Sequence, residues 1–156
     1  MIKIAQYKGK SFVSRLIKFI TWGQYSHTAI ILGDGRIVEA WQGSNSVRVI
    51  PSLSDGHKPG THIDVYKITM GRRQEILFTN FVLAQVGKKY DLWGILGFLW
   101  RKDLQRSESW FCSELFAAGC KAADIRLLNN REPSQVSPSL ITQSIITILI
   151  KSIVTE

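Results

Sequence analysis

Apolar and polar positions alternate along much of the first half of the chain, as they do in half-buried β-strands. The alternation predicts strands at residues 2–7, 25–32, 36–41, 47–50 and 63–68. The sequence Gly33-Asp34-Gly35 separates the second strand from the third, and a glycine-rich break of this kind is a strong hairpin signal. We therefore expect a mainly antiparallel sheet in this half of the chain.

Helical spacing of apolar residues appears in segments that flank and follow these strands. Residues 11–20 place Phe12, Val13, Leu16, Ile17 and Ile20 on one face of a helix, with Arg15 and Lys18 on the other. We expect the apolar face to pack on the core, and a membrane-surface role is the less favoured alternative. A second helix is expected over residues 73–86, ending at Gly87.

The last third of the chain predicts a helix that begins close to a cysteine. Ser107 and Ser109 precede the segment from Trp110 onward, and serine is a favoured residue before a helix, so Cys112 falls in the first helical turn. Ser137-Pro138 indicates the start of another helix. The isoleucine-rich residues 145–150 fit a strand or a buried helix, and periodicity does not separate the two.

Length and composition indicate one globular domain. The 156 residues are 45% hydrophobic and 21% charged, which suits a single α+β domain over residues 1–156. The N-terminus lacks the pattern of a secretory signal, and the longest uncharged stretch, Pro133 to Ile150, is too interrupted for a membrane span. We expect a cytoplasmic protein, with peripheral membrane binding as an option.

The net charge of +8 is concentrated near the N-terminus, where five basic residues precede the first acidic one, Asp34. These are Lys3, Lys8, Lys10, Arg15 and Lys18. Such a face could meet an anionic membrane surface or a cell-wall polymer, although a solvated face is equally compatible with it. Nucleic acid is not an expected partner, because no recognised binding motif accompanies the charge.

The two cysteines are expected to be free thiols. Cys112 and Cys120 are eight residues apart in one predicted helix, so their Cα atoms would lie roughly 12 Å from each other, beyond disulfide range. Neither has a second ligand at metal-binding spacing, so we expect no metal and no cofactor. A thiol in the first turn of a helix meets unpaired N–H groups, which favour a reactive thiolate and could stabilise an oxyanion.

A histidine and a glutamate interrupt two neighbouring apolar strands. If Gly33-Asp34-Gly35 forms a three-residue loop, Ala29 pairs with Glu39 and His27 with Trp41. His27 and Glu39 then become diagonal neighbours on one face, roughly 7 to 8 Å apart at the backbone. A two-residue loop would instead place them on opposite faces. In the first register Glu39 can orient the imidazole, which becomes a candidate base for Cys112.

These motifs resemble a known family. The runs YSHTAIILGDGRIVEAW, GKKYDLWG and WFCSELFAAGCKAA, followed by Pro138 and Leu140, resemble the permuted papain-like amidases of the YiiX/YaeF type in the NlpC/P60 superfamily. The resemblance implies a circularly permuted papain-like fold with its nucleophile on a late helix. It also implies a thiol hydrolase that cleaves a peptide or N-acyl amide bond through an acyl-enzyme.

The family's functional cysteine, histidine and glutamate correspond to Cys112, His27 and Glu39. Its tyrosine ahead of the cysteine helix corresponds to Tyr90, a candidate for substrate binding, and Trp41 would flank the site. The expected substrates are peptides, cell-wall fragments or acylated small molecules.

Two alternative functions stay open. The same layout resembles the lecithin:retinol acyltransferase-like phospholipases and acyltransferases, although this chain has Phe111-Cys112-Ser113-Glu114 where they have Asn-Cys-Glu-His. A catalytically inactive module that binds membrane or cell wall is the other alternative. Four further residues are given no catalytic role: His57 and His62 are read as surface residues, Cys120 as a small core residue, and Glu114 as a solvent-facing or helix-dipole residue.

Overall fold

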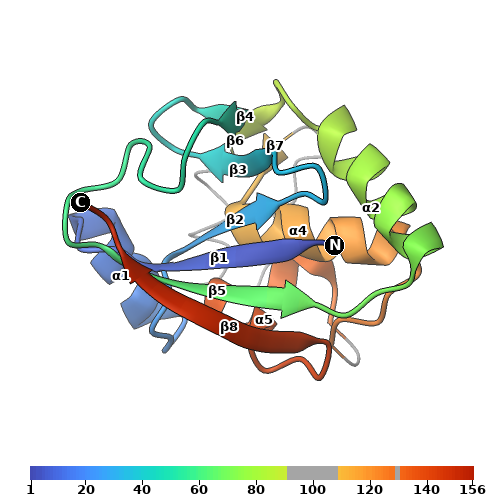
Figure 1. The fold of residues 1–156 in the computed structure, drawn as a ribbon. Coiled ribbons are helices and arrows are strands. Elements are labelled where there is room, and N and C mark those ends of the chain that lie inside the picture. The colour runs from blue at the N-terminus through green and yellow to red at the C-terminus, as the bar shows by residue number, and fades with distance from the viewer. Residues whose placement is uncertain (91–108, 129–130) are drawn as a thin grey trace.

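The computed structural model describes residues 1–90, 109–128 and 131–156. These residues form an eight-stranded sheet in the order β7-β6-β4-β3-β2-β1-β5-β8 (Figure 1). The strands are β1 (Lys3–Lys8), β2 (His27–Ile31), β3 (Ile37–Trp41), β4 (Ser46–Ile50), β5 (His62–Ile68), β6 (Lys89–Tyr90), β7 (Ser109–Trp110) and β8 (Thr147–Val154). The helices are α1 (Phe12–Ile20), α2 (Arg72–Ala84), α4 (Cys112–Ala122), the 3₁₀ turn η1 (Pro133–Gln135) and α5 (Pro138–Ile141).

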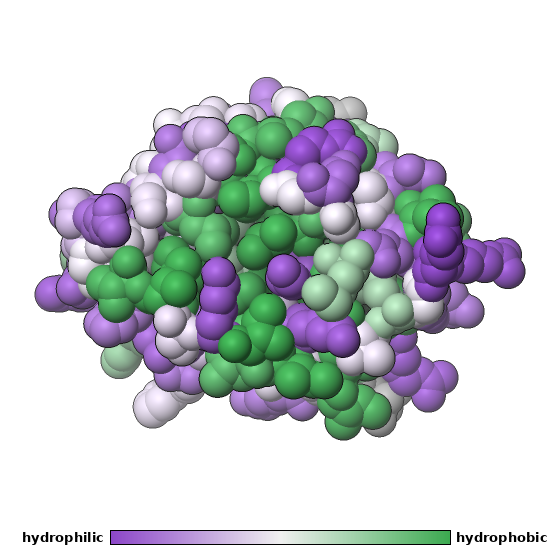
Figure 2. All heavy atoms as spheres, viewed as in Figure 1, coloured by the Kyte–Doolittle hydropathy of each residue, from purple (hydrophilic) through white to green (hydrophobic). Residues whose placement is uncertain are grey.

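The sheet confirms the predicted α+β class and its mainly antiparallel character. All neighbouring strands pair antiparallel except β6 and β7, which pair in parallel. The isoleucine-rich segment, which periodicity could not assign, is the edge strand β8 beside β5. Several of its apolar side chains are exposed, and Figure 2 shows hydrophobic surface along this edge.

The hairpin between β2 and β3 has the register that the three-residue loop predicts. Ala29 lies opposite Glu39 and Ile31 opposite Ile37. Gly35 has a φ of 93°, a left-handed conformation that glycine adopts without strain. The side chains of β2 and β3 therefore alternate faces as expected, and His27 and Glu39 share a face.

One face of the sheet is covered by α4, with α2 beside it (Figure 1). The core between them includes Val38 from the sheet, Phe78 from α2, and Leu115 and Phe116 from α4, each fully buried. The rings of Phe78 and Phe116 meet edge to face, 5.6 Å between centroids. This layer places the N-terminal end of α4 against β2.

The other face carries a smaller apolar cluster, formed chiefly by Ala5, Tyr7, Ala29, Ile63 and Val65. The loop of residues 51–61 contributes to this cluster through Leu53. The Tyr7 hydroxyl donates a hydrogen bond of 3.1 Å to the Leu53 carbonyl oxygen, which ties the loop to the sheet. Positive φ angles at Gly56 and Gly60, 74° and 75°, let the loop turn back.

Helix α1 packs on the core with only part of its predicted apolar face. Ile17 is buried, and Val13 and Ile20 pack against the core. Phe12 and Phe19, by contrast, are 81% and 74% exposed. The prediction was wrong for Phe12 and Leu16, because the helix is rotated so that positions 13, 17 and 20 face inward.

Several strand ends converge at one end of the sheet. Tyr7 pairs with His27 at the end of β1 and the start of β2, and Trp41 ends β3. Because β1 leads directly into α1 and the 51–61 loop leads into β5, both lie at this same end. The candidate functional residues are brought together here.

Candidate functional site

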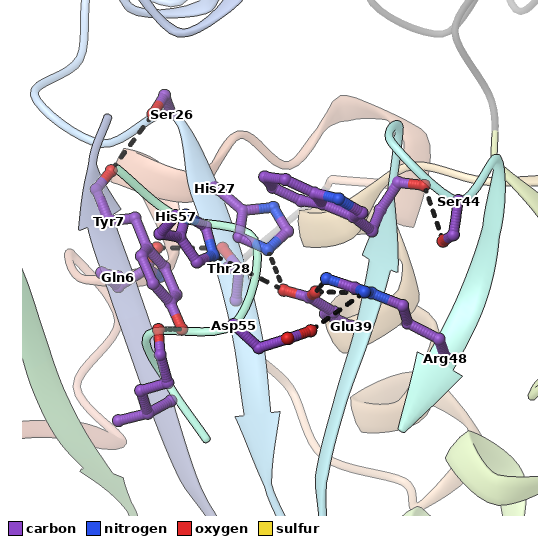
Figure 3. Close-up of polar contacts among 12 residues, drawn as sticks. Gln6, Tyr7, Ser26, His27, Thr28, Glu39, Ser44, Arg48, Asp55 and His57 are labelled. Carbon is purple, nitrogen blue, oxygen red and sulfur yellow. Dashed lines mark hydrogen bonds and ion pairs between the residues drawn. The ribbon is translucent and has the colours of Figure 1, made fainter. Parts of the chain in front are cut away.

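His27 and Glu39 form a buried pair on the face of the sheet opposite α4. The His27 Nε2 atom lies 2.7 Å from Glu39 Oε2, and both residues are almost inaccessible to solvent, at 7% and 1% exposed (Figure 3). The sequence-based pairing of these two residues is present in the structure. A buried carboxylate that accepts from an imidazole fixes the ring's orientation and its tautomer.

Arg48 on β4 holds the other oxygen of the glutamate. Its Nε and Nη2 atoms donate to Glu39 Oε1 at 3.0 and 2.7 Å, and its Nη1 atom lies 3.0 Å from Asp55. The pairing follows from the sheet, where Glu39 lies directly opposite Arg48. Arg48 thereby neutralises a carboxylate that would be costly to bury alone.

His57 is part of this cluster, so its interpretation as a surface residue was wrong. Its side chain is 6% exposed, and its Nε2 atom lies 3.8 Å from Glu39 Oε2. The ring stacks on Tyr7 with a centroid separation of 4.0 Å. The 51–61 loop folds back over the sheet and carries His57 into the site, a tertiary contact that local polarity does not reveal.

The electrostatics of the site favour an ionised glutamate beside neutral imidazole. Burial would raise the pKa of Glu39, but its hydrogen bond with His27, the nearby His57 and the Arg48 guanidinium outweigh burial and hold that pKa well below its usual range. Burial lowers the pKa of His27 despite the raising effect of Glu39. With Glu39 ionised, the neutral ring donates its Nε2 proton and leaves Nδ1 as an acceptor.

Cys112 is the first residue of α4 and packs in the core layer between this helix and the sheet. The residue is 1% exposed. Burial raises the pKa of the Cys112 thiol to about 12, although backbone hydrogen bonds from Thr28 and Ser113 act in the opposite direction. The helix N-terminus was expected to lower the pKa of this thiol, but burial outweighs that effect in this structure.

The structure brings Cys112 to β2 but not onto the His27 ring. The thiol contacts the backbone of Thr28, the residue directly after His27. The His27 ring lies with Tyr7 and Trp41, at centroid distances of 5.2 and 5.1 Å, on the other face of the sheet. Among the hydrogen bonds of residues 1–90, 109–128 and 131–156, none joins Cys112 to His27.

Cys120 and Glu114, two other residues of α4, were predicted to be a small core residue and a solvent-facing or helix-dipole residue. Cys120 is a fully buried free thiol in the core, as predicted, and Cys112 is also a free thiol. Glu114 is not solvent-facing, since it is 5% exposed, and its carboxylate accepts a hydrogen bond of 3.3 Å from the Phe111 N–H. Glu114 thus caps the helix that presents Cys112.

The two candidate substrate-binding residues occupy different surroundings. Trp41 flanks the site as predicted, with its ring centroid 4.8 Å from that of His57. Tyr90 on β6 is 7% exposed and lies 6.1 Å from the Phe111 ring, next to the start of α4. Its substrate-binding role stays a prediction. The aromatic run that follows it, residues 92–100, lies outside the described residues.

Within the described parts of the chain, the helices are all too short or too polar to cross a bilayer.

His62 begins β5 and is exposed, as predicted for a residue without a role in the site. Arg48 and His57 are the members of the cluster that sequence reasoning missed. Arg48 could have been found by extending the strand pairing from β3 to β4, which places this polar residue opposite Glu39.

Comparison with known proteins identifies the fold. No family model matches the chain, and no curated protein matches it at the sequence level. A crystal structure described as metalloprotein YiiX from Escherichia coli O157:H7 superposes with a TM-score of 0.68 at 16% sequence identity, covering 96% of this chain and 94% of that one. The described chain therefore has a YiiX-like α+β fold.

Proposed function

We propose that the protein is a cysteine hydrolase of the amidase type, in which Cys112 is the nucleophile, His27 the base and Glu39 the residue that orients the base. The observation that carries the proposal is the buried His27–Glu39 pair at the strand end against which α4 presents Cys112. The YiiX-like fold and the motif resemblance support the same assignment.

The proposed reaction follows from the protonation states at the site. His27 accepts the Cys112 proton at Nδ1 while Glu39 holds Nε2, and the thiolate attacks the carbonyl carbon of an amide. The imidazolium then protonates the leaving amine, and water hydrolyses the resulting thioester to release the acid and restore the thiol. The first step requires the Cys112 sulfur and His27 Nδ1 to approach each other at the end of β2, so the described arrangement, in which they lie on opposite faces of the sheet, is a resting one.

Alkylation of Cys112 by iodoacetamide tests the proposal. In a Cys120→Ser background, we expect the labelling rate to report a Cys112 pKa below that of an ordinary thiol, about 8.5, because His27 stabilises the thiolate. The His27→Ala variant should move this pKa upward and slow labelling at neutral pH. The His62→Ala variant, which removes an exposed histidine, should leave the profile unchanged.

A high labelling pKa that does not depend on His27 would contradict the proposal. A thiol held permanently in the resting arrangement would have a pKa of about 12 and would resist labelling at neutral pH. If the labelling pKa lies at or above about 8.5 and does not respond to His27→Ala, Cys112 and His27 do not act together and the hydrolase proposal fails.

A second candidate function, binding to an anionic membrane surface, is supported by helix α1. Phe12, Leu16 and Phe19 form an exposed stripe along the helix, and Trp22 just beyond it is 92% exposed. Arg15 and Lys10, both exposed, carry positive charge beside this stripe. Aromatic side chains flanked by basic residues suit the headgroup region of an anionic bilayer.

The position of α1 gives this surface a relation to the site. Figure 1 shows α1 at one end of the molecule, with α2 at the other. Since α1 connects Lys8 at the end of β1 to β2, which begins with His27, it lies at the sheet end that carries the candidate site. Docking through α1 would bring that end of the sheet toward lipid, which suits an acylated substrate.

Vesicle sedimentation tests this surface. The protein should pellet with vesicles that contain phosphatidylglycerol and less with neutral phosphatidylcholine vesicles. Reversing Arg15 and Lys18 to glutamate should weaken partitioning at least about tenfold, at about 1 kcal/mol for each basic residue near the surface. Replacing Phe12, Phe19 and Trp22 by serine should also weaken it.

The matched control replaces three exposed apolar residues elsewhere, Ile145, Ile148 and Leu149, by serine. We expect this control to bind vesicles like the unmodified protein. Equal loss in both triple variants would show that binding does not depend on α1, and the absence of salt-sensitive binding would exclude the membrane role.

A further inference from the structure

The cluster of His27, Glu39 and His57 contains one polar atom without a partner. The Nε2 atom of His57 is buried and makes no hydrogen bond, at 3.8 Å from Glu39 Oε2. A buried nitrogen without a hydrogen-bond partner is unfavourable, because it has lost water without gaining another partner, and such atoms call for an explanation. Figure 3 shows the His57 ring on the same side of the sheet as His27 and Glu39, with Nε2 directed at the glutamate.

The three side chains supply a recognised set of metal ligands. One ring nitrogen of His27, one of His57 and one oxygen of Glu39 all lie within 4.8 Å of one another. Two imidazoles and one carboxylate form the ligand set of many zinc sites that keep a fourth position open. From these contacts we propose that His27, Glu39 and His57 bind a divalent transition-metal ion of the Zn²⁺ class.

The distances between the ligand atoms are close to those that zinc requires. Zn–N and Zn–O bonds of about 2.0–2.2 Å at tetrahedral angles place neighbouring ligand atoms about 3.3 Å apart. The His27–Glu39 separation of 2.7 Å would open by about half an ångström and the His57–Glu39 separation of 3.8 Å would close by about as much. The widest separation in the set, up to 4.8 Å, would have to close by about 1.5 Å, so the two imidazole rings must turn toward the ion.

The surroundings of the cluster hold these ligands as a metal site requires. Arg48 binds Glu39 Oε1 and leaves Oε2 for the ion, so the carboxylate would bind through one oxygen. Asp55 holds Arg48 in turn, which adds negative charge near the site. Tyr7 stacks on the His57 ring and fixes its plane. Such outer contacts orient metal ligands and tune their affinity.

Metal binding would compete with the thiol chemistry, a consequence that rests on the proposed function. An ion bound at His27 Nε2 displaces the proton shared with Glu39, and a neutral ring then carries its proton on Nδ1. Nδ1 can no longer accept the Cys112 proton. The two uses of His27 therefore exclude each other, and zinc would act as an inhibitor of the hydrolase.

Calorimetric titration of the metal-free protein with Zn²⁺, together with the visible absorption of Co²⁺ in its place, tests the site without any activity assay. We expect one ion per chain and a cobalt spectrum of low coordination number. His57→Ala should weaken Zn²⁺ binding more than about a hundredfold, beyond the 10- to 100-fold typical of losing an outer contact. Circular dichroism and urea unfolding would establish that the variant is folded.

Two control variants separate this site from other ligands on the chain. His62→Ala removes an exposed histidine five residues further along and should bind Zn²⁺ like the unmodified protein. Cys112→Ser should also bind normally, because the thiol lies in the other core layer. If the unmodified protein binds no Zn²⁺, or if folded His57→Ala binds as tightly, the metal site is excluded.

The same proteins distinguish this inference from the hydrolase proposal. Zinc binding that depends on His57 supports the metal site even if Cys112 proves unreactive toward iodoacetamide. Conversely, reactive Cys112 in a protein that binds no zinc supports the hydrolase alone. If both hold, saturating Zn²⁺ should suppress the labelling of Cys112 in the unmodified protein and leave it unchanged in His57→Ala.

Discussion

Replacing Glu39 by alanine should lower the free energy of unfolding by about 3–5 kcal/mol, the cost of breaking a buried ion pair by removing one partner. Glu39 is 1% exposed and accepts from His27 through one oxygen and from Arg48 through the other. Without it, the buried His27 ring N–H loses its acceptor, and Arg48 keeps only its contact with Asp55. Urea denaturation followed by circular dichroism measures the change.

The control is the exposed pair of Asp34 and Arg36, whose side chains are 47% and 48% exposed. Asp34→Ala removes a carboxylate with a similarly close contact to arginine, but solvent screens this pair, so we expect a much smaller loss of stability than for Glu39→Ala. Should Glu39→Ala prove no more costly than Asp34→Ala, the cluster would contribute no more than a surface ion pair, and its rigidity could not support either proposed role.

The hairpin that holds His27 and Glu39 could be predicted because two local signals agree. The Gly33-Asp34-Gly35 loop sets the register, and a buried acid beside a buried histidine requires a partner. Both signals come from residues close in the sequence. The observed pairing of Ala29 with Glu39 confirms this reasoning at the level of single residues.

His57 and the resting position of Cys112 could not be predicted, because both depend on contacts between distant segments. His57 reaches the site through a loop that packs on Tyr7, fifty residues away in the chain. The first turn of α4 favours thiolate, but the packing of α4 on β2 buries the sulfur, and burial has the larger effect on its pKa. The preference of a helix N-terminus for negative charge does not reveal which residues pack over that end of the helix.

The exposed stripe of α1 shows the same limit for a surface helix. Spacing along α1 identified an apolar face, yet apolar residues extend around so much of the helix that the sequence does not decide which third packs inward. Packing against the sheet selects Ile17 and leaves Phe12 and Phe19 exposed. The sequence could suggest a membrane-surface role for this helix, but only the tertiary structure shows that Phe12 and Phe19 are among the exposed residues that would carry it.

The contact between α4 and α2 leads to a prediction that helix propensity alone would not make. Gly119 lies within α4, where alanine would favour the helix by about 1 kcal/mol. A Cβ atom at this position, however, would lie 2.7 Å from Cε2 of Phe78 and 3.2 Å from Cγ2 of Val82. Both neighbours are fully buried side chains of α2, so neither can move into solvent.

We therefore expect Gly119→Val to lower the free energy of unfolding by about 3 kcal/mol, at the upper end of what overpacking a core costs, because α4 and α2 must separate. Ala122→Val introduces the same side chain at an exposed position of the same helix and should cost about 0.5 kcal/mol through propensity alone. Urea unfolding of the two variants measures the difference. Equal stabilities would mean that the helices accommodate the added volume. A large difference would show that their close approach is needed to fix α4, and with it Cys112, against β2.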